Sequence, residues 1–299
     1  MKVLNFGSLN LDHFFHTDHI VKPGETLTAS AYETRPGGKG LNQSIALAKA
    51  GVPVCHAGCY GSGGEFLKQA LEENGVNTEL LKRTDQPQGN ALIQVDAAGE
   101  NSIILFAGSN ACITEEQVRE TLSSFAKGDW LFLQNEISCL PAIIDEAYTK
   151  GMNIVLNPSP FNEKLDAVSF EKLSWLIVNE IEAKALCGSD DPQNAAELLH
   201  QKYPDLNFVI TFGEAGSIGF RQREKAFQPS CPVNAVDTTG AGDTYTGYFF
   251  AAVIEGRPLS ECMKRASAAA AIAVTRPGAA ASIPTKEEVE IYLANEILK

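Results

Sequence analysis

The stretch Asp237-Thr238-Thr239-Gly240-Ala241-Gly242-Asp243 joins strand-like residues from Val233 to a helical pattern over 244–255. Small residues at a helix start leave backbone N–H groups uncovered where the helix dipole is positive, which favours anion binding. A fixed carboxylate there would repel a phosphate. Asp243 makes sense if it removes a proton from a hydroxyl while the amides of Gly240, Ala241 and Gly242 hold the transferred phosphoryl group. The alternative is a helix cap after a tight glycine turn.

The same order of strand and helix recurs outward from this stretch. Short runs rich in Val, Ile, Leu and Phe alternate with helical patterns, several of which end at a glycine suited to a left-handed cap. This alternation predicts an α/β fold with a mostly parallel sheet covered by helices. The expected strands are 2–6, 52–57, 130–134, 153–157, 175–178 and 208–211, and the expected helices include 41–50, 66–74, 141–150, 244–255, 259–275 and 286–297.

Two stretches carry no helical pattern. Residues 13–32 hold two extended runs around Lys22-Pro23-Gly24-Glu25, and 91–106 is typical of a hairpin that turns at Ala97-Ala98-Gly99-Glu100. Together they predict a small antiparallel sheet that serves as a lid. Residues 1–12, 33–90 and 107–299 then form the main α/β domain.

Composition limits the possible partners. The formal net charge of −13 argues against a nucleic-acid or acidic-membrane surface, because either needs a basic face. The seven cysteines show no metal-ligand spacing, so we expect them to be reduced. We find no signal peptide and no apolar run of about 18 residues, so we expect a cytoplasmic location and no membrane span.

Polar residues follow several expected strands, at the sheet edge where α/β folds bind ligands. Asn10 and Asp12 follow the first strand, and Glu136 follows 130–134. A second glycine turn, Gly37-Gly38-Lys39-Gly40-Leu41-Asn42, leads into a helix, and Lys39 and Asn42 offer donors suited to sugar hydroxyls. Surface turns with solvated side chains are the alternative for each of these positions.

Two further strand ends suit a nucleotide. Asn179 is a good helix N-cap, and with Glu182 it would also approach nucleotide phosphates and their magnesium through water. The stretch Thr211-Phe212-Gly213-Glu214-Ala215-Gly216 would wrap a base and ribose, or form a simple hairpin turn. The chain has no G-x-x-x-x-G-K-[ST] phosphate loop.

Taken together, these stretches resemble the ribokinase family of carbohydrate kinases, also called the phosphofructokinase-B type, over nearly the whole chain. The stretches at 37–42 and 237–243 resemble its two signatures, in the right order and about 200 residues apart. Further similarity, greatest to the ribokinases, extends to Asn10-Leu11-Asp12, Pro23-Gly24-Glu25-Thr26, Asn157-Pro158-Ser159-Pro160 and 268–276. The resemblance implies a doubly wound sheet with a β-sheet lid that often builds a homodimer.

The resemblance also implies ATP, magnesium and often activation by potassium. By position it assigns catalysis to Asp243 with the Gly240, Ala241 and Gly242 amides, and sugar binding to Asn10, Asp12, Gly38, Lys39, Asn42, Glu136 and Asp243. It assigns nucleotide and phosphate binding to Asn179, Glu182, Thr211, Gly213, Gly216, Gly242 and Ser267. It assigns a potassium loop to Asp237, Thr239, Ala273, Arg276, Gly278 and Ser282.

We therefore expect transfer of the ATP γ-phosphoryl group to the primary hydroxyl of a pentose, ribose first. A ketohexose, deoxyribose or nucleoside substrate remains an alternative, and so does a sugar-binding sensor without turnover. An oxidoreductase would need a G-x-G-x-x-G turn after the first strand, which is lacking. The chain departs from the family pattern at Arg35-Pro36, Asn90, Ser267 and Tyr248.

Overall fold

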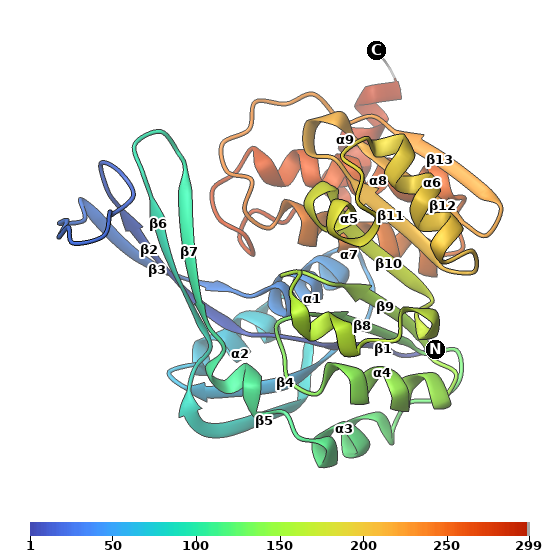
Figure 1. Cartoon of the computed structure of the whole chain (residues 1–299), viewed down its shortest axis with the longest axis horizontal. Coiled ribbons are helices and arrows are strands. Elements are labelled where there is room, and N and C mark those ends of the chain that lie inside the picture. Colours follow the sequence, from blue (N-terminus) through green and yellow to red (C-terminus); the bar gives the residue numbers. More distant parts are fainter. Residues whose placement is uncertain (298–299) are drawn as a thin grey trace.

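The computed structural model describes residues 1–297, and its centre is a nine-stranded sheet of order β13-β12-β11-β10-β9-β8-β1-β4-β5 (Figure 1). All pairs from β5 across to β11 are parallel, and β12 and β13 are added antiparallel at one edge. The predicted mostly parallel sheet is confirmed. The strands are β1 (Val3–Phe6), β4 (Cys55–Ser62), β5 (Asn77–Pro87), β8 (Trp130–Gln134), β9 (Asn153–Asn157), β10 (Trp175–Asn179), β11 (Asn207–Thr211), β12 (Ser217–Arg221) and β13 (Glu224–Gln228).

Helices cover both faces of this sheet. Along β8, Trp130 and Phe132 join one buried cluster and Leu131 and Leu133 join the other, because successive strand side chains point to opposite faces. The first cluster takes in α1 (Lys39–Lys49), α2 (Glu65–Glu73), α7 (Ala241–Ile254), α8 (Leu259–Val274) and α9 (Lys286–Ile297). The second takes in α3 (Glu115–Leu122), α4 (Leu140–Thr149), α5 (Glu180–Cys187) and α6 (Pro192–Lys202). The architecture is the expected doubly wound one.

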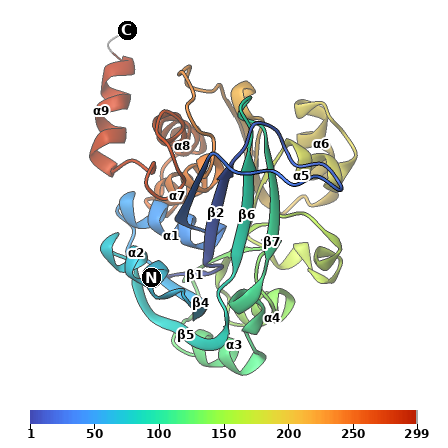
Figure 2. The ribbon, with the colours of Figure 1, turned by 90° about the vertical axis from the view of Figure 1, so that its left-hand side faces the viewer.

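A separate sheet of order β3-β2-β6-β7 projects from this body (Figures 1 and 2). It consists of β2 (Asn10–His16), β3 (Ala31–Gly37), β6 (Asn90–Val95) and β7 (Asn101–Phe106). The β2–β3 and β6–β7 pairs are antiparallel, and a parallel pairing of β2 with β6 joins them. The hairpin turns at the expected residues, where Gly99 has a φ of 84°. The strands begin before residue 13 and continue past residue 32, up to Gly37.

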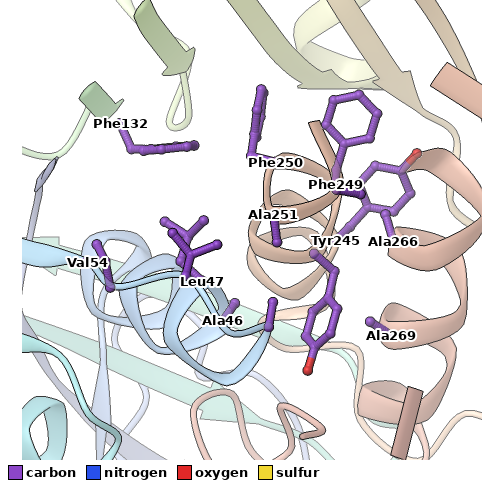
Figure 3. Close-up of a cluster of buried hydrophobic side chains, with 14 of the residues drawn as sticks. Ala46, Leu47, Val54, Phe132, Tyr245, Phe249, Phe250, Ala251, Ala266 and Ala269 are labelled. Atoms are coloured by element: carbon purple, nitrogen blue, oxygen red, sulfur yellow. The ribbon is translucent and has the colours of Figure 1, made fainter. Parts of the chain in front are cut away.

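The contact between α1 and α7 sets the geometry of the site (Figure 3). A Cβ added at Gly247 would lie 2.3 Å from the Cβ of Ala46, so the two helices approach more closely than any larger residue at 247 allows. Asn42 and Asp243 each lie one helical turn before this contact. Because residues four apart share a helix face, the close packing brings these two side chains together.

One expected strand is wrong. Residues 229–240 form no strand, and the N–H groups of Val236 and Asp237 donate instead to the carbonyl of Val274, at the end of α8. The β12–β13 hairpin was not predicted, and neither was β5, whose exposed and charged residues hide its strand pattern. Within residues 1–297 no helix is both long enough and apolar enough to cross a membrane.

Candidate active site

The entrance to α7 is open around the glycines. Gly240 is the N-cap, with a φ of 74°, and a Cβ added there would lie 2.9 Å from the Cβ of Ala279. At Gly242 an added Cβ would meet no protein atom within 4 Å. Helix geometry leaves N–H groups of the first turn without intrahelical acceptors. The residues 240–242 therefore offer donors, and no side chain covers Gly242, as an anion site requires.

Asp243 lies in this first turn, 7% exposed, and two amides from α1 hold it. Asn42 Nδ2 donates to Oδ2 at 3.0 Å, and Gln43 Nε2 donates to Oδ1 at 2.9 Å. Each carboxylate oxygen thus has one fixed donor, which orients the group. The Oδ1 atom of Asn42 is buried and has no hydrogen-bond partner, so an unsatisfied acceptor lies beside the carboxylate.

Asp12 lies on β2, opposite the glycine turn. A Cβ on Gly37 would lie 1.9 Å from Asp12 Oδ2, so this glycine makes room for the carboxylate. Burial raises the pKa of Asp12 from its ordinary value of 3.8 to about 7, the charges of Glu136 and Asp243 add to the effect, and that of Lys39 opposes it. The carboxyl group is therefore protonated more easily than an ordinary aspartate and lies in a poorly solvated position.

Lys39, the first residue of α1 after the N-cap Gly38, lies among carboxylates. Removal from water disfavours its ammonium group, but four negative charges outweigh this and raise its pKa. In decreasing order of effect they are Asp243, Glu136, Glu182 and Asp12. The structure therefore brings residues predicted for sugar, phosphate and magnesium into one electrostatic cluster.

Glu136 ties the glycine turn to the sheet. Its Oε2 accepts the Lys39 N–H at 3.0 Å and the Ser8 hydroxyl. Burial raises the pKa of Glu136, although Lys39 and these hydrogen bonds oppose the effect. Its position after β8 agrees with the prediction that polar groups gather at the carboxyl ends of parallel strands.

Asn110 was not among the predicted site residues, but it orients the predicted residue Asn10. Asn110 Nδ2 donates to Asn10 Oδ1 at 2.7 Å, and Asn110 Oδ1 accepts the Leu9 N–H at 3.0 Å. Gly89 leaves room for this pair, since a Cβ there would lie 2.2 Å from Asn110 Nδ2. Asn10 is thereby fixed beside Asp12 at the start of β2.

Gln43 was also not selected as a site residue, although it holds the central carboxylate. Gln134 Nε2 donates to Gln43 Oε1 at 2.7 Å and to Asn5 Oδ1 at 3.1 Å. Asn5 Nδ2 in turn donates to Ser44 Oγ at 2.9 Å. These residues form a buried polar chain that connects Asp243 to the first strand of the sheet.

This series of buried hydrogen bonds ends at His56, whose Nδ1 lies 2.7 Å from Ser44 Oγ. Burial lowers the pKa of His56 to about 4, opposed by a hydrogen bond to the Gly7 carbonyl. The imidazole is therefore neutral near neutral pH. The hydrogen-bonded side chains thus orient Asp243 without placing a charged histidine behind it.

The residues predicted to bind nucleotide include a group at the ends of β10 and β11. Asn179 and Thr211 are register partners in these parallel strands. Asn179 Oδ1 accepts the Glu182 N–H at 2.9 Å, and Glu182 Oε2 accepts the Asn179 N–H at 3.0 Å, so the N-cap interpretation of Asn179 is confirmed. The negative charge of Glu182 also helps to raise the pKa of Lys39.

Gly213 and Gly216 shape the turn between β11 and β12. Their φ angles are 52° and 97°, and Phe212 N donates to the Gly216 carbonyl at 2.8 Å. The hairpin-turn alternative for 211–216 is thus the structure adopted, and nucleotide binding by this turn stays a prediction. Ser267 lies on α8, where its hydroxyl donates to the Pro229 carbonyl at 3.4 Å.

The predicted cation loop is assembled around Asp237. Its Oδ1 accepts the Thr239 N–H at 2.9 Å, and its Oδ2 accepts the Gly278 N–H at 2.8 Å. Partial burial opposes ionisation, but these hydrogen bonds and the charge of Arg35 prevail and lower the pKa of Asp237. Two segments far apart in sequence are therefore held side by side by one carboxylate.

The remaining loop residues offer mostly backbone oxygens. The Ser282 hydroxyl donates to the Ala279 carbonyl at 2.8 Å, and the Arg276 side chain pairs with Glu288, so Arg276 can contribute only its carbonyl. Ala273 has only a carbonyl to offer. Residues 1–297 contain no group of three or more His, Cys, Asp or Glu side chains placed to hold a metal. One carboxylate and several carbonyls make an all-oxygen donor set, which fits a hard cation such as the predicted potassium ion.

Comparisons with known proteins agree with this geometry. The model of the pfkB family carbohydrate kinases matches residues 1–286. A ribokinase of Haemophilus influenzae is 37% identical over 300 residues, covering 96% of each chain. A deoxyribokinase of Salmonella typhi is 31% identical and covers 98% of this chain and 99% of its own.

A solved structure of Arabidopsis thaliana ribokinase, complexed with ribose and ATP, superposes with a TM-score of 0.84 at 28% identity. The similarity covers 98% of both chains, so it includes the small sheet as well as the large one. With the family model, the relatives and the assembled site in agreement, the chain belongs to the pfkB family of carbohydrate kinases.

Proposed function

We propose that this carbohydrate kinase transfers the γ-phosphoryl group of ATP to the primary hydroxyl of a pentose, ribose first, with Asp243 as general base. The observation that carries the proposal is the buried carboxylate at the entrance of α7, held through both oxygens by Asn42 and Gln43. A base must be oriented toward the hydroxyl whose proton it takes. The neighbouring glycine amides would stabilise the charge on the transferred group.

In the proposed complex the sugar lies between β2 and α1. The Asp12 carboxylate and the unpartnered Asn42 Oδ1 would accept hydrogen bonds from sugar hydroxyls, and Asn10 and Lys39 would donate them. Gly38 would let the sugar approach the backbone. Both the ribokinase and the deoxyribokinase similarities favour a pentose over a larger substrate.

ATP would lie along the carboxyl ends of β10 and β11, with its γ-phosphate at α7. Magnesium would neutralise phosphate charge, and Glu182 would hold it through water because this cation gives up its hydration reluctantly. The Asp237 loop would hold a potassium ion through backbone oxygens. Lys39 would add a positive charge at the reacting centre.

The small sheet would close over the sugar as a lid and pair with a second copy. On β7, Ile103, Ile104, Leu105 and Phe106 are each about half exposed or more. Exposed apolar residues on an edge strand are normally covered by a partner. A homodimer through this sheet would cover them, and lid closure would exclude water from the phosphoryl transfer.

The test of the base is Asp243→Asn in a coupled ADP-release assay. We expect kcat to fall by about 100-fold to 10,000-fold, with sugar binding by calorimetry retained. Asp129→Asn is the matched control, because Asp129 is also buried but precedes β8 at the opposite end of the strand. Undiminished turnover of Asp243→Asn would refute the assignment.

The substrate is tested with ribose, deoxyribose, fructose, tagatose and nucleosides, each with potassium or with a larger organic cation. Ribose should give the highest kcat/KM. A higher kcat/KM for deoxyribose would instead indicate the activity for which the Salmonella typhi relative is named. Tight sugar binding without turnover on any of these compounds would favour a sensor.

A further inference from the structure

Arg35 is fixed within the small sheet. Its Nε and one terminal nitrogen donate to Glu33 at 3.0 and 2.6 Å, and its guanidinium carbon lies 5.0 Å from the centre of the Phe14 ring. A bidentate carboxylate and an aromatic face together restrict the guanidinium to one orientation. The charge is therefore held in place.

The other terminal nitrogen of Arg35 points at the cation loop. It lies 4.0 Å from Asp237 Oδ2, and an ideal Cβ on Gly278 would lie 3.2 Å from it. Gly278 has a φ of 85° and donates its N–H to Asp237. A fixed positive charge from strand β3 thus lies beside Asp237 and next to the Gly278 segment of the loop.

A potassium ion in this loop would share the negative potential of Asp237 with Arg35. Two positive charges that share one carboxylate repel each other, and at a partly exposed site this repulsion would weaken binding on the order of tenfold. The Arg35 guanidinium would also partly replace the ion, because its positive charge screens an incoming phosphate from the negative charge of Asp237. The carbonyl oxygens stay available, so the ion is disfavoured but not blocked.

We propose that Arg35 is a built-in positive charge of the cation loop, which weakens potassium binding and lowers the dependence of turnover on potassium. The proposal rests on the proposed function for two points: potassium binding in the loop and the place of the loop beside the phosphoryl site. It assigns to Arg35 a positioning role through Asp237, not contact with substrate.

The first measurement is potassium binding without catalysis. Thermal unfolding is followed against potassium chloride, with tetramethylammonium chloride holding the ionic strength constant. We expect Arg35→Gln to be stabilised by potassium at about tenfold lower concentration than the unmodified protein. Arg35→Lys, which keeps a charge, should respond less than Arg35→Gln. Arg83→Gln removes an exposed arginine of β5 and should match the unmodified protein.

The second measurement is turnover in tetramethylammonium chloride alone. Arg35→Gln should lose about tenfold in kcat there and recover when potassium is added, whereas Arg83→Gln should need no rescue. Equal potassium midpoints for Arg35→Gln and Arg83→Gln would overturn the proposal. So would the absence of any potassium response in all four proteins. Sugar phosphorylation by the unmodified protein would survive either result, so failure here differs from failure of the kinase assignment.

Discussion

Replacement of Asp12 by asparagine should stabilise the free protein in a pH-dependent way. The native carboxyl has a pKa of about 7, against 3.8 ordinarily. The native state therefore binds the proton more tightly than the unfolded chain does. Its stability falls as pH rises from about 4 through about 7. The loss is complete above the native pKa, where both states are ionised.

The magnitude follows from the same two values. Each pKa unit corresponds to about 1.4 kcal/mol, so ionised Asp12 lowers the free energy of unfolding by at most about 4 kcal/mol. Between about pH 5 and about pH 8 the change amounts to roughly 2.5 kcal/mol. Asparagine has no such titration, and the carboxyl groups outside this cluster titrate alike in both proteins. The difference in unfolding free energy between Asp12→Asn and the unmodified protein should therefore increase by roughly 2.5 kcal/mol from about pH 5 to about pH 8.

Urea unfolding of both proteins at several pH values measures this difference, provided the two m-values agree. In parallel, kcat/KM for the sugar should decrease in the unmodified protein as the pH is lowered below about 7. This decrease should be absent in Asp12→Asn. A stability difference that is the same at about pH 5 and about pH 8 would refute the reasoning, because Asp12 would then titrate normally in the folded protein.

Three further substitutions test the surroundings of the site. Gln43→Met removes a donor to Asp243 and should lower kcat about tenfold with little change in sugar KM; an unchanged kcat means that Gln43 does not position the base. Gly37→Ala places a Cβ 1.9 Å from Asp12 Oδ2 and should raise sugar KM at least about tenfold, which calorimetry can check. Tyr248→Phe removes a 2.6 Å hydrogen bond to a buried carbonyl and should lower the free energy of unfolding by about 1–2 kcal/mol, with kcat retained. A larger loss in kcat than in stability would contradict a purely structural role for Tyr248.

Much of the fold could be predicted because its strands are buried on both faces. Runs such as Trp130–Gln134 are apolar throughout and stand out from the amphipathic helices between them. The sequence around Val233 is also strand-like, but its backbone pairs with the end of α8 instead of a strand. Local pattern cannot tell these two outcomes apart, because the choice depends on partners distant in the chain.

The candidate site was predictable where its residues follow strands or glycine turns. Asp12, Glu136 and Asp243 all occupy such positions and meet in one cluster. Asn110 and Gln43 have no comparable local signal, since each bonds to a residue 100 or more positions away. Their roles follow from helix and strand packing, which places buried amides against the groups they orient.

The strand β2 begins with the proposed sugar contacts and runs without a break into the projecting sheet, and β3 returns from that sheet directly into the turn that carries Lys39. Swinging the projecting sheet outward should consequently carry Asn10 and Asp12 along with it. The same movement would then both open the site and break the contacts that hold the phosphorylated sugar. Substitutions at the distant tip between these two strands should alter how long the product stays bound.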